Sequence, residues 1–432
     1  MTYLDKEKNF VYDGFLKLFD YVKKNNYEGM DPFDGLNSKL FKSTFLYKSR
    51  FFRLALIQFC KLCPINFRKL LLVPEGFNAK AGALFLLGNL KMFKATGDEK
   101  YKKEAQNLYK KLKEVSIKRG DETWEGLGWG YNFDWQARAF YVPVGTPNIV
   151  TSVYVGKALI KYYKLFNDEE ALELAKQITE FILNEMILTE NENFLCFRYI
   201  PNEDAQVHNA NLLAASFLAS ISKYINFGSR LGLLTQQHEN SDILNIILYN
   251  SEELRGKIQK SLNFSIADIN EDGSWAYGTK PFHRWVDNFH TAFNIESLID
   301  IQNIVNIPSL NKTIEKVMQY YLTNLFTEKG LPKYYNNKVY PIDIHVIAEV
   351  IIVLNKIKSS KIIYDEKRLN CIEEEILKCL KLFQDKKGYF YFQKNNYFGK
   401  YFGEHFLNKI PYIRWGEAWI FFALSTIILA DN

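Results

Sequence analysis

Cysteine is scarce in this sequence. Five cysteines occur in 432 residues, an odd number that does not suit a disulfide framework. Cys60 and Cys63 form a CxxC spacing, but it lies inside the helical pattern "FFRLALIQFCKLCP" and no second pair follows, which favours buried free thiols over a redox or zinc site. No HExxH motif or other short pair of histidine ligands occurs. The sequence therefore predicts a cytoplasmic protein with no metal and no cofactor.

Long apolar stretches are also missing. The first residues, "MTYLDKEKNFVYDGFLKLF", contain early acids and no continuous apolar core, which is unlike a secretory signal. The longest apolar run, "AWIFFALSTIILA", is shorter than the roughly 20 residues that a spanning helix needs. We expect this run to form a buried helix and the protein to have no membrane span.

A continuous run of basic residues is missing too. The formal net charge is +6, and the lysines are spread along amphipathic patterns, which argues against a nucleic-acid partner and suits an anionic small molecule or glycan. Aromatic side chains are in excess, with 34 Phe and 27 Tyr, and hydrophobic residues make up 47% of the chain. That composition provides a large buried core and excludes a disordered chain.

Apolar residues recur at helical spacing in pairs of segments, and no strand pattern is long enough to build a sheet. In most pairs the first segment is apolar nearly all round and the second has one apolar face, which predicts an inner and an outer layer. The fold prediction is therefore all-α: an (α/α)6 barrel or toroid of helical hairpins with short β-hairpin loops on one rim. The expected pairs are 11–26 with 43–64, 78–96 with 98–116, 147–166 with 169–186, 208–226 with 242–268, 290–305 with 309–327, and 342–358 with 367–384, followed by a helix at 414–430.

We expect a single domain over residues 1–432, in which residues 1–70 are the part that the hairpin pattern defines least. Loops that lead into the inner helices open at the same end of such a barrel. Five of the six histidines and all seven tryptophans fall in these loops. Free N–H groups at helix N-termini favour oxyanions, and aromatic faces suit sugar rings. The combination predicts a carbohydrate cleft at this end.

Histidine and tyrosine in these loops are candidates for proton transfer, because histidine titrates near neutrality and tyrosine can act as its partner. Carboxylates are the rival chemistry, since a glycosidase needs two carboxyl groups that flank one bond. Helix N-capping is the alternative role for Asp287 and Asp343. The expected catalytic residues are His290, His345, Tyr277 and Tyr131 for proton abstraction, and Asp287 and Glu417 for hydrolysis.

Arginines in these loops could hold a substrate carboxylate in bidentate fashion, and aromatic residues could stack on sugars. Among them, Arg284 and Arg414 are the expected carboxylate ligands. The full set of expected substrate-binding residues is Trp129, Asp134, Trp135, Arg138, His208, Arg284, Trp285, Asp343, Arg414 and Trp415.

Several of these segments resemble a known group. "HNANLLAASFLA", "DGSWAYG", "RWVDNFHTAFNIESL" and "RWGEAWIFFAL" are similar to VpsJ-like bacterial polysaccharide-biosynthesis proteins, within the α/α-toroid superfamily of six-hairpin glycosidases and terpenoid cyclases. The resemblance implies a toroid that works in capsule, O-antigen or exopolysaccharide assembly. "DGSW" and "VDNFHTA" also resemble terpene-cyclase motifs, but Asn288 and Phe289 replace the expected aspartates and no DDxxD motif occurs.

The sequence thus predicts an enzyme that acts on an anionic, uronic-acid-containing glycan of the bacterial surface, either free or lipid-linked. Proton abstraction of the epimerase or lyase type is the leading chemistry. Two alternatives remain open: a glycoside hydrolase with paired carboxylates, and a non-catalytic glycan-binding subunit that works with polysaccharide assembly proteins.

Overall fold

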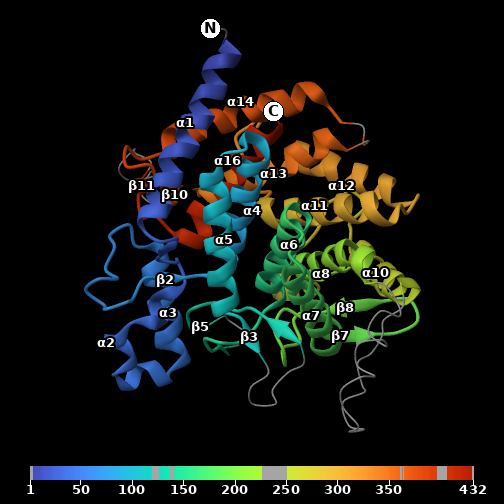
Figure 1. Ribbon diagram of the computed structural model, residues 1–432, viewed down its shortest axis with the longest axis horizontal. Coiled ribbons are helices and arrows are strands. Elements are labelled where there is room, and N and C mark those ends of the chain that lie inside the picture. The colour runs from blue at the N-terminus through green and yellow to red at the C-terminus, as the bar shows by residue number, and fades with distance from the viewer. Residues whose placement is uncertain are drawn as a thin grey trace.

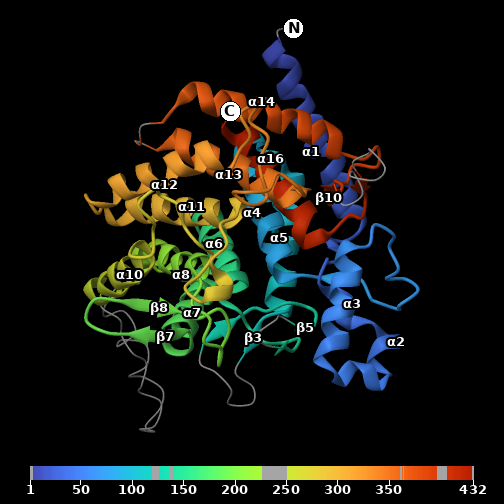
Figure 2. The same cartoon turned by 180° about the vertical axis from the view of Figure 1, so that it is seen from behind.

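Two concentric rings of helices make up most of the computed structural model, which describes residues 3–118, 126–136, 141–225, 251–360, 362, 364–396 and 406–430 (Figures 1 and 2). Each inner helix packs against the next, and the last packs against the first, so the inner ring is closed. Its members are α4 (Ala79–Thr96), α6 (Ile149–Phe166), α8 (His208–Ile221), α11 (Asn288–Val305), α13 (Ile344–Ser359) and α16 (Ala418–Ala430).

The outer ring covers the inner ring, one outer helix to each inner helix. Burial follows the sequence patterns: every residue from 344 to 354 of α13 is buried, whereas α14 buries only a stripe that includes Leu369, Ile372 and Ile376. The structure confirms the predicted all-α double ring of helices. The outer members are α1 (Tyr3–Lys24), α5 (Glu99–Glu114), α7 (Glu169–Glu185), α10 (Ser251–Ile266), α12 (Leu310–Asn324) and α14 (Glu366–Phe383).

One predicted hairpin is wrong. The sequence patterns paired 11–26 with 43–64, but α1 packs against α16, so helices near the two ends of the chain form the sixth pair. The Phe15 ring of α1 lies 4.7 Å from the Phe421 ring of α16, centroid to centroid. Helical spacing reveals an apolar face but not which distant segment covers it. The expectation of a single domain over residues 1–432 stays a prediction.

Short strands lie in the loops at the end of the ring where the inner helices begin. Neighbouring lead-in loops bridge to one another, Val207 to Gly278 and Asp287 to Tyr335, which places these loops at one end. We call this end the mouth. The sheets are antiparallel: β1 (Glu28–Gly29) with β2 (Gly76–Phe77), β3 (Ile117–Lys118) with β4 (Leu127–Gly128), β5 (Trp135–Gln136) with β6 (Tyr141–Val142), β7 (Ile187–Glu190) with β8 (Leu195–Phe197), and β10 (Gln393–Asn395) between β9 (Ile342–Asp343) and β11 (Phe406–Asn408).

Residues 34–72, which we call the rim segment, lie outside both rings, beside the mouth (Figure 1). Hydrogen bonds hold the segment to a mouth loop: the Tyr47 hydroxyl donates to Asp134 over 2.7 Å, and Arg53 Nε donates to Gln136 Oε1 over 2.9 Å. The segment comprises η1 (Asp34–Asn37), α2 (Lys39–Lys42), η2 (Phe45–Lys48) and α3 (Arg50–Leu62); the other short turns are η3 (Ser222–Tyr224) and η4 (Pro281–His283).

By length and composition, one helix of the described chain could cross a membrane. It runs over Ile413–Ala430, 18 residues with a mean hydropathy of 1.4, and joins the π-helical turn η5 (Ile413–Glu417) to α16. Most of it is buried inside the fold, where α16 packs against α1, α4 and α13. Such burial is typical of a core helix and agrees with the buried helix expected from "AWIFFALSTIILA".

Candidate functional site

The first turn of α11 holds a hydrogen-bonded Asp–His pair. Asp287 is the N-cap, because its Oδ1 accepts from the backbone N–H of His290 over 2.9 Å. Its Oδ2 lies 2.6 Å from Nδ1 of His290 and accepts from Nε1 of Trp285 over 3.0 Å. Asp287 is buried, whereas the His290 side chain keeps 20% exposure. Since Nδ1 is occupied by the carboxylate, Nε2 is the nitrogen left for a ligand.

An aromatic wall stands beside His290. The Tyr277 ring lies 4.4 Å from the His290 ring and stacks on Trp285 at 4.7 Å with an interplanar angle of 12°. Burial, and then the Asp287 charge, raise the pKa of Tyr277 far above its usual value, so its phenol stays protonated at neutral pH. Tyr277 can therefore donate a hydrogen bond or a proton here, but it is not a base.

His345, in the first turn of α13, is fully enclosed and has no polar partner. The residue is 2% exposed, and neither ring nitrogen has a hydrogen-bond partner in the described part of the chain. Its ring stacks on Trp419 at 4.8 Å and meets the edge of Trp415 at 4.6 Å. Burial, and then the positive charges of Lys80 and Arg414, lower the pKa of His345 well below its usual value. The imidazole is therefore neutral, and neither of its nitrogens is occupied by a partner in the described chain.

Asp343 occupies the matching position before α13 and positions its neighbours. Its carboxylate caps the helix at the N–H of His345 over 2.8 Å and accepts from Nε1 of Trp415 at 3.1 and 3.2 Å. Gln393 also donates to this carboxylate. Burial raises the pKa of Asp343 to about 6. The structure thus gives Asp343 the N-cap role and uses it to hold Trp415 beside His345.

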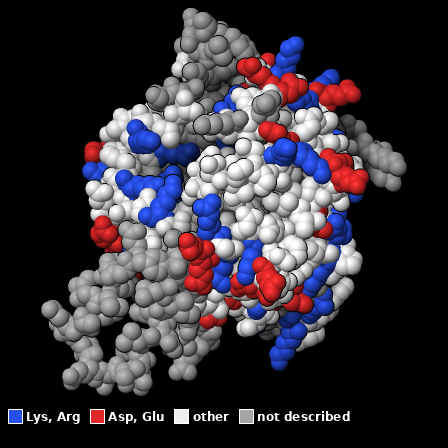
Figure 3. All heavy atoms as spheres, turned by 90° about the vertical axis from the view of Figure 1, so that its right-hand side faces the viewer, with Lys and Arg blue, Asp and Glu red and all other residues white. Residues whose placement is uncertain are grey.

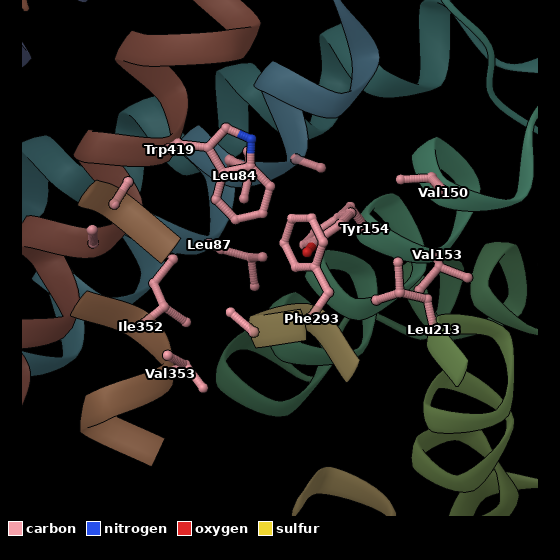
Figure 4. Close-up of a cluster of buried hydrophobic side chains, with 14 of the residues drawn as sticks. Leu84, Leu87, Val150, Val153, Tyr154, Leu213, Phe293, Ile352, Val353 and Trp419 are labelled. Carbon is pink, nitrogen blue, oxygen red and sulfur yellow. The ribbon is translucent and has the colours of Figure 1, made fainter. Parts of the chain in front are cut away.

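Lys80, which the sequence analysis did not single out, lies against the same Trp419 ring as His345. It is 4% exposed, and its ammonium lies 5.0 Å from the Tyr154 ring centre and 4.9 Å from that of Trp419. Figure 4 shows Tyr154, Phe293 and Trp419 converging from α6, α11 and α16 inside the inner ring. Burial, and then Arg414, lower the pKa of Lys80 to about 7. The signal in the sequence was a lysine at the start of the otherwise apolar helix "AKAGALFLLGNL".

Arg414 does not face a free site, which corrects the expectation that it holds a substrate carboxylate. Its guanidinium binds Asp31 in bidentate fashion at 2.6 and 2.8 Å, and both residues are buried. Burial by itself would lower the pKa of Arg414, but the Asp31 carboxylate outweighs it and the pKa rises. The guanidinium also lies 4.9 Å from the Tyr131 ring centre. The pair is a neutral unit in the wall of the mouth.

His208 and Arg284 share one carboxylate partner, Asp268. The Asp268 carboxylate lies 2.8 Å from Nε2 of His208 and 2.5 Å from Arg284 Nη1. His208 is fully buried, and its Nδ1 lies 3.2 Å from the Ser265 hydroxyl. Both side chains thus have an internal partner, and the expectation that they bind substrate stays a prediction.

The loop before α6 contains the remaining expected binding residues. Asp134 forms a salt bridge with Lys42 at 2.7 Å and accepts a hydrogen bond from the Tyr47 hydroxyl. Trp129 is buried, and its indole N–H donates to the Leu112 carbonyl over 2.8 Å. These internal contacts correct the expectation of ligand binding for Asp134 and Trp129. Tyr131 bonds to the Tyr199 hydroxyl, and Trp135 lies 6.2 Å from both tyrosine rings. Arg138 lies outside the described residues.

Glu417 is not assembled with Asp287 into a carboxylate pair. It is 1% exposed, and both its oxygens accept from the Phe390 N–H, at 3.2 and 3.1 Å. Burial raises the pKa of Glu417 well above its usual value, so its carboxyl group is protonated at neutral pH. Asp287 instead bonds to Trp285 and His290. The two carboxyl groups therefore lie in different surroundings, and the hydrolytic pair expected from the sequence has no support in these contacts.

The residues that the structure describes contain no cluster of metal-ligating side chains. No group of three or more His, Cys, Asp or Glu there could hold a metal ion, and all five cysteines are free. Cys60 of the CxxC spacing is buried, and burial raises the pKa of its thiol to about 11.

Solved structures share this arrangement at low sequence identity. Cellobiose 2-epimerase from Bacillus thermoamylovorans B4167 matches with a TM-score of 0.58 and 15% identity, over 82% of this chain and 88% of that one. A polysaccharide lyase, BACCELL_00875, matches with a TM-score of 0.57 and 9% identity, over 98% of each chain. This chain has the α/α-toroid fold. Unsaturated glucuronyl hydrolase from Bacillus sp. GL1 is a further toroid match, with a TM-score of 0.52 and 13% identity over 79% and 84%.

No protein-family model and no curated protein matches the sequence. The VpsJ-like resemblance therefore stays a prediction, while the wider α/α-toroid resemblance is confirmed by the structures. Within the toroid, the mouth brings His290, His345, Tyr277, Trp285 and Trp415 together through their shared aromatic contacts.

Proposed function

We propose that this toroid is a carbohydrate-active enzyme that moves a proton on a uronic-acid-containing glycan, by epimerase or lyase chemistry. The carrying observation is His345, a buried neutral histidine whose two ring nitrogens have no partner in the described chain. His290 is close to it, since the Phe289 ring lies 4.2 Å from the His290 ring and 5.1 Å from the His345 ring. Two histidines near one space can supply a base and an acid.

The two histidines differ in ways that suit these separate roles. Asp287 bonds to Nδ1 of His290, which stabilises the imidazolium that forms when Nε2 takes a proton. His345 lies among Trp415, Trp419 and Phe289, where water is excluded and the neutral form is favoured. In the proposed step, one histidine removes the proton from the carbon next to the carboxylate. The other, His290 as the imidazolium bound to Asp287, returns a proton from Nε2 to the opposite face for epimerisation, or protonates the departing oxygen for β-elimination.

In this proposal Lys80 binds the substrate carboxylate, the role that the sequence analysis gave to Arg284 and Arg414. A uronate carboxylate gains negative charge when the neighbouring carbon loses its proton, so a cation in a dry site stabilises that state. Arg414 is already neutralised by Asp31, whereas Lys80 faces aromatic rings. An arriving carboxylate would favour the charged ammonium and raise the pKa of Lys80 from its resting value of about 7.

The toroid neighbours support carbohydrate chemistry of this kind, since they are named as a cellobiose 2-epimerase, a polysaccharide lyase and a glucuronyl hydrolase. The biological setting belongs to the proposal as well. We place the enzyme in the cytoplasm, in the assembly of a bacterial surface polysaccharide, with a free or lipid-linked glycan as substrate. The VpsJ-like resemblance of "RWVDNFHTAFNIESL" is the support for that setting.

Incubation with a panel of uronic-acid oligosaccharides in D2O tests the chemistry. Epimerase activity places deuterium on C5, lyase activity generates an unsaturated sugar, and hydrolysis generates reducing ends without exchange. We expect His290→Asn and His345→Asn each to lower turnover by about 10²–10⁴-fold. Glu417→Gln is the matched control, because burial keeps Glu417 protonated and glutamine preserves its shape.

The same assay separates the alternatives. Activity that survives both histidine substitutions but is lost in Glu417→Gln would support a hydrolase and contradict proton abstraction. Full-strength glycan binding without turnover on any oligosaccharide would support a non-catalytic binding subunit.

A further inference from the structure

The rim segment has an unusual charge distribution. Residues 35–74 contain eight Lys and Arg and no Asp or Glu, so this stretch carries more positive charge than the +6 of the whole chain. Lys39, Lys48, Arg50 and Lys69 are exposed, and no salt bridge to them occurs among the described residues. By contrast, the face in Figure 3, on the other side of the molecule from α2 and α3 in Figure 1, shows acidic and basic side chains interspersed.

The rim segment also exposes large apolar side chains. Of the seventeen exposed large hydrophobic residues in the described chain, nine lie between residues 40 and 72. Phe45, Phe51 and Leu70 are 81%, 71% and 72% exposed, values that leave these side chains almost wholly in solvent. The others are Leu40, Phe52, Phe59, Leu62, Ile65 and Leu72. Soluble proteins rarely gather so much exposed apolar surface without a binding partner.

Helix α3 shows how the two properties combine. Ile57 and Cys60 face inward and are buried, and Cys60 contacts η1. Phe51, Ala55, Phe59 and Leu62 recur at helical spacing and are exposed, so they form an outward stripe. Arg50 begins this stripe. A helix with exposed aromatic and aliphatic residues and basic neighbours is typical of proteins that lie in the interface of a membrane.

We propose that the exposed face of the rim segment docks on an anionic lipid bilayer. Phenylalanine and leucine side chains would enter the boundary between head groups and acyl chains, while the lysines and arginines contact anionic head groups. Charge complementarity selects this occupant, because four exposed basic residues without a salt bridge in the described chain, on a stretch with no Asp or Glu, suit a continuous sheet of negative charge. A second copy of this chain would bring like charges together.

Docking would also orient the mouth. The rim segment is fixed to the mouth loop by the Tyr47–Asp134 and Arg53–Gln136 hydrogen bonds, and the Lys61 ammonium lies 5.0 Å from the Phe33 ring, which contacts Trp415. A docked protein would therefore hold its mouth close to the bilayer, where a lipid-linked glycan is presented. That orientation rests on the proposed function, whereas lipid binding itself does not.

Vesicle flotation of the purified full chain tests the proposal without any glycan, so its result is independent of the enzymatic assay. We expect binding to vesicles of phosphatidylcholine mixed with phosphatidylglycerol, and weaker binding to phosphatidylcholine alone or in high salt. Each basic residue near an anionic surface strengthens binding by about fivefold, so Lys39→Glu/Lys48→Glu/Arg50→Glu should weaken it by at least about 100-fold. Phe45→Ser/Phe51→Ser should weaken it by at least about tenfold.

Two matched controls change the same chemistry elsewhere on the surface. Lys312→Glu/Lys316→Glu/Lys329→Glu makes the same change in net charge on and after α12, and Phe194→Ser removes an exposed aromatic residue between β7 and β8. Both should bind anionic vesicles like the wild type, and thermal melts should show that all variants are folded.

Three results would overturn the proposal. One is no flotation with anionic vesicles. Another is equal weakening in the rim and α12 charge variants, which would show that only net charge matters. The last is a wild-type dimer by light scattering that Phe45→Ser/Phe51→Ser converts to a monomer, because the apolar face would then be an interface between two copies of the chain.

Discussion

Two buried basic side chains near the mouth have no ion-pair partner in the described chain, whereas a buried lysine a few turns further along α13 has two. Near the mouth, His345 has no hydrogen-bond partner among the described residues and Lys80 faces aromatic rings. Deeper along α13, Lys356 binds Glu296 at 2.8 Å and Asp300 at 2.6 Å. Native structures satisfy nearly all buried polar groups. His345 is one of several exceptions in the described chain, and it lies beside the aromatic residues of the proposed site.

Glu349 lies between the two regions. Burial, and then the neighbouring Glu296 carboxylate, raise the pKa of Glu349 well above its usual value, so it is a neutral carboxyl group. The Glu349 charge would otherwise favour the protonated form of Lys80. A neutral Glu349 separates the paired cluster from the unpaired one and helps to keep the pKa of Lys80 low.

The largest expected effect is on catalysis, at the mouth of the ring. His345→Asn should lower turnover on the responsive uronic-acid substrate by about 10²–10⁴-fold. It should change the melting temperature little, because the imidazole makes no hydrogen bond that asparagine would lose. Turnover and thermal melts of the same preparation check this. A large fall in melting temperature with turnover preserved would assign His345 a packing role instead.

The next effect is a pH dependence of stability from Lys80. Burial lowers its pKa from 10.5 to about 7, so between these values the unfolded chain holds a proton that the folded chain has lost. The free energy of unfolding therefore rises with pH across this window, and the full penalty applies below pH 7. Relative to Lys80→Met, the wild type should gain about 3–4 kcal/mol from the bottom to the top of the window.

Urea unfolding of wild type and Lys80→Met at several pH values measures that difference. The exposed variant Lys312→Met is the control and should show no such trend. A difference between wild type and Lys80→Met that stays constant over the window would mean that Lys80 remains charged in the folded state.

Around Lys356, deeper in the ring, the expected effect is a loss of stability. Lys356→Met should lower the free energy of unfolding by about 2–3 kcal/mol, because it leaves Glu296 and Asp300 without their shared cation. Lys91→Met is the matched control on α4: its ammonium lies 5.0 Å from the Phe422 ring centre, and burial lowers its pKa to about 8. The control should be neutral or stabilising. Equal losses in both variants would contradict the contrast between paired and unpaired lysines.

The smallest effect is expected on the exposed face of the outer ring. Lys102 and Glu99 of α5 form an exposed pair at 3.3 Å, one helical turn apart. Lys102→Ala should change the free energy of unfolding by less than about 0.5 kcal/mol, because water screens such pairs. A loss comparable to that of Lys356→Met, in the same urea series, would show that burial is not what separates these interactions.

Much of the fold could be predicted because burial pattern is local information. An all-round apolar segment such as "IDIHVIAEVIIVLNKI" has to be enclosed, and one with a single stripe has to face solvent. The caps were equally accessible, since Asp287 and Asp343 stand directly before helical patterns and do cap α11 and α13. The partner of α1 was not, because an apolar stripe does not state which distant helix will cover it.

The candidate site, too, could be predicted from the sequence only in part. Composition and spacing predicted that histidine and tryptophan collect at the mouth, and the placement of His290 and His345 beside one Phe289 ring fits that prediction. The sequence could not show that Arg414 is taken by Asp31, far away in the chain, or that His208 bonds to Asp268. Lys80 was missed for the converse reason: a single lysine among apolar residues gives no sign that it has no carboxylate partner among the residues that the structure describes.

By itself the sequence determined the layers of this protein, because the period of its apolar residues fixes which helix faces are hidden from water. It also determined where the unusual residues gather, since every inner helix is preceded by a lead-in loop. Only the tertiary structure decided which charged groups are paired. Pairing depends on distances of a few ångströms between residues remote in the chain, and those distances exist only once the ring has closed.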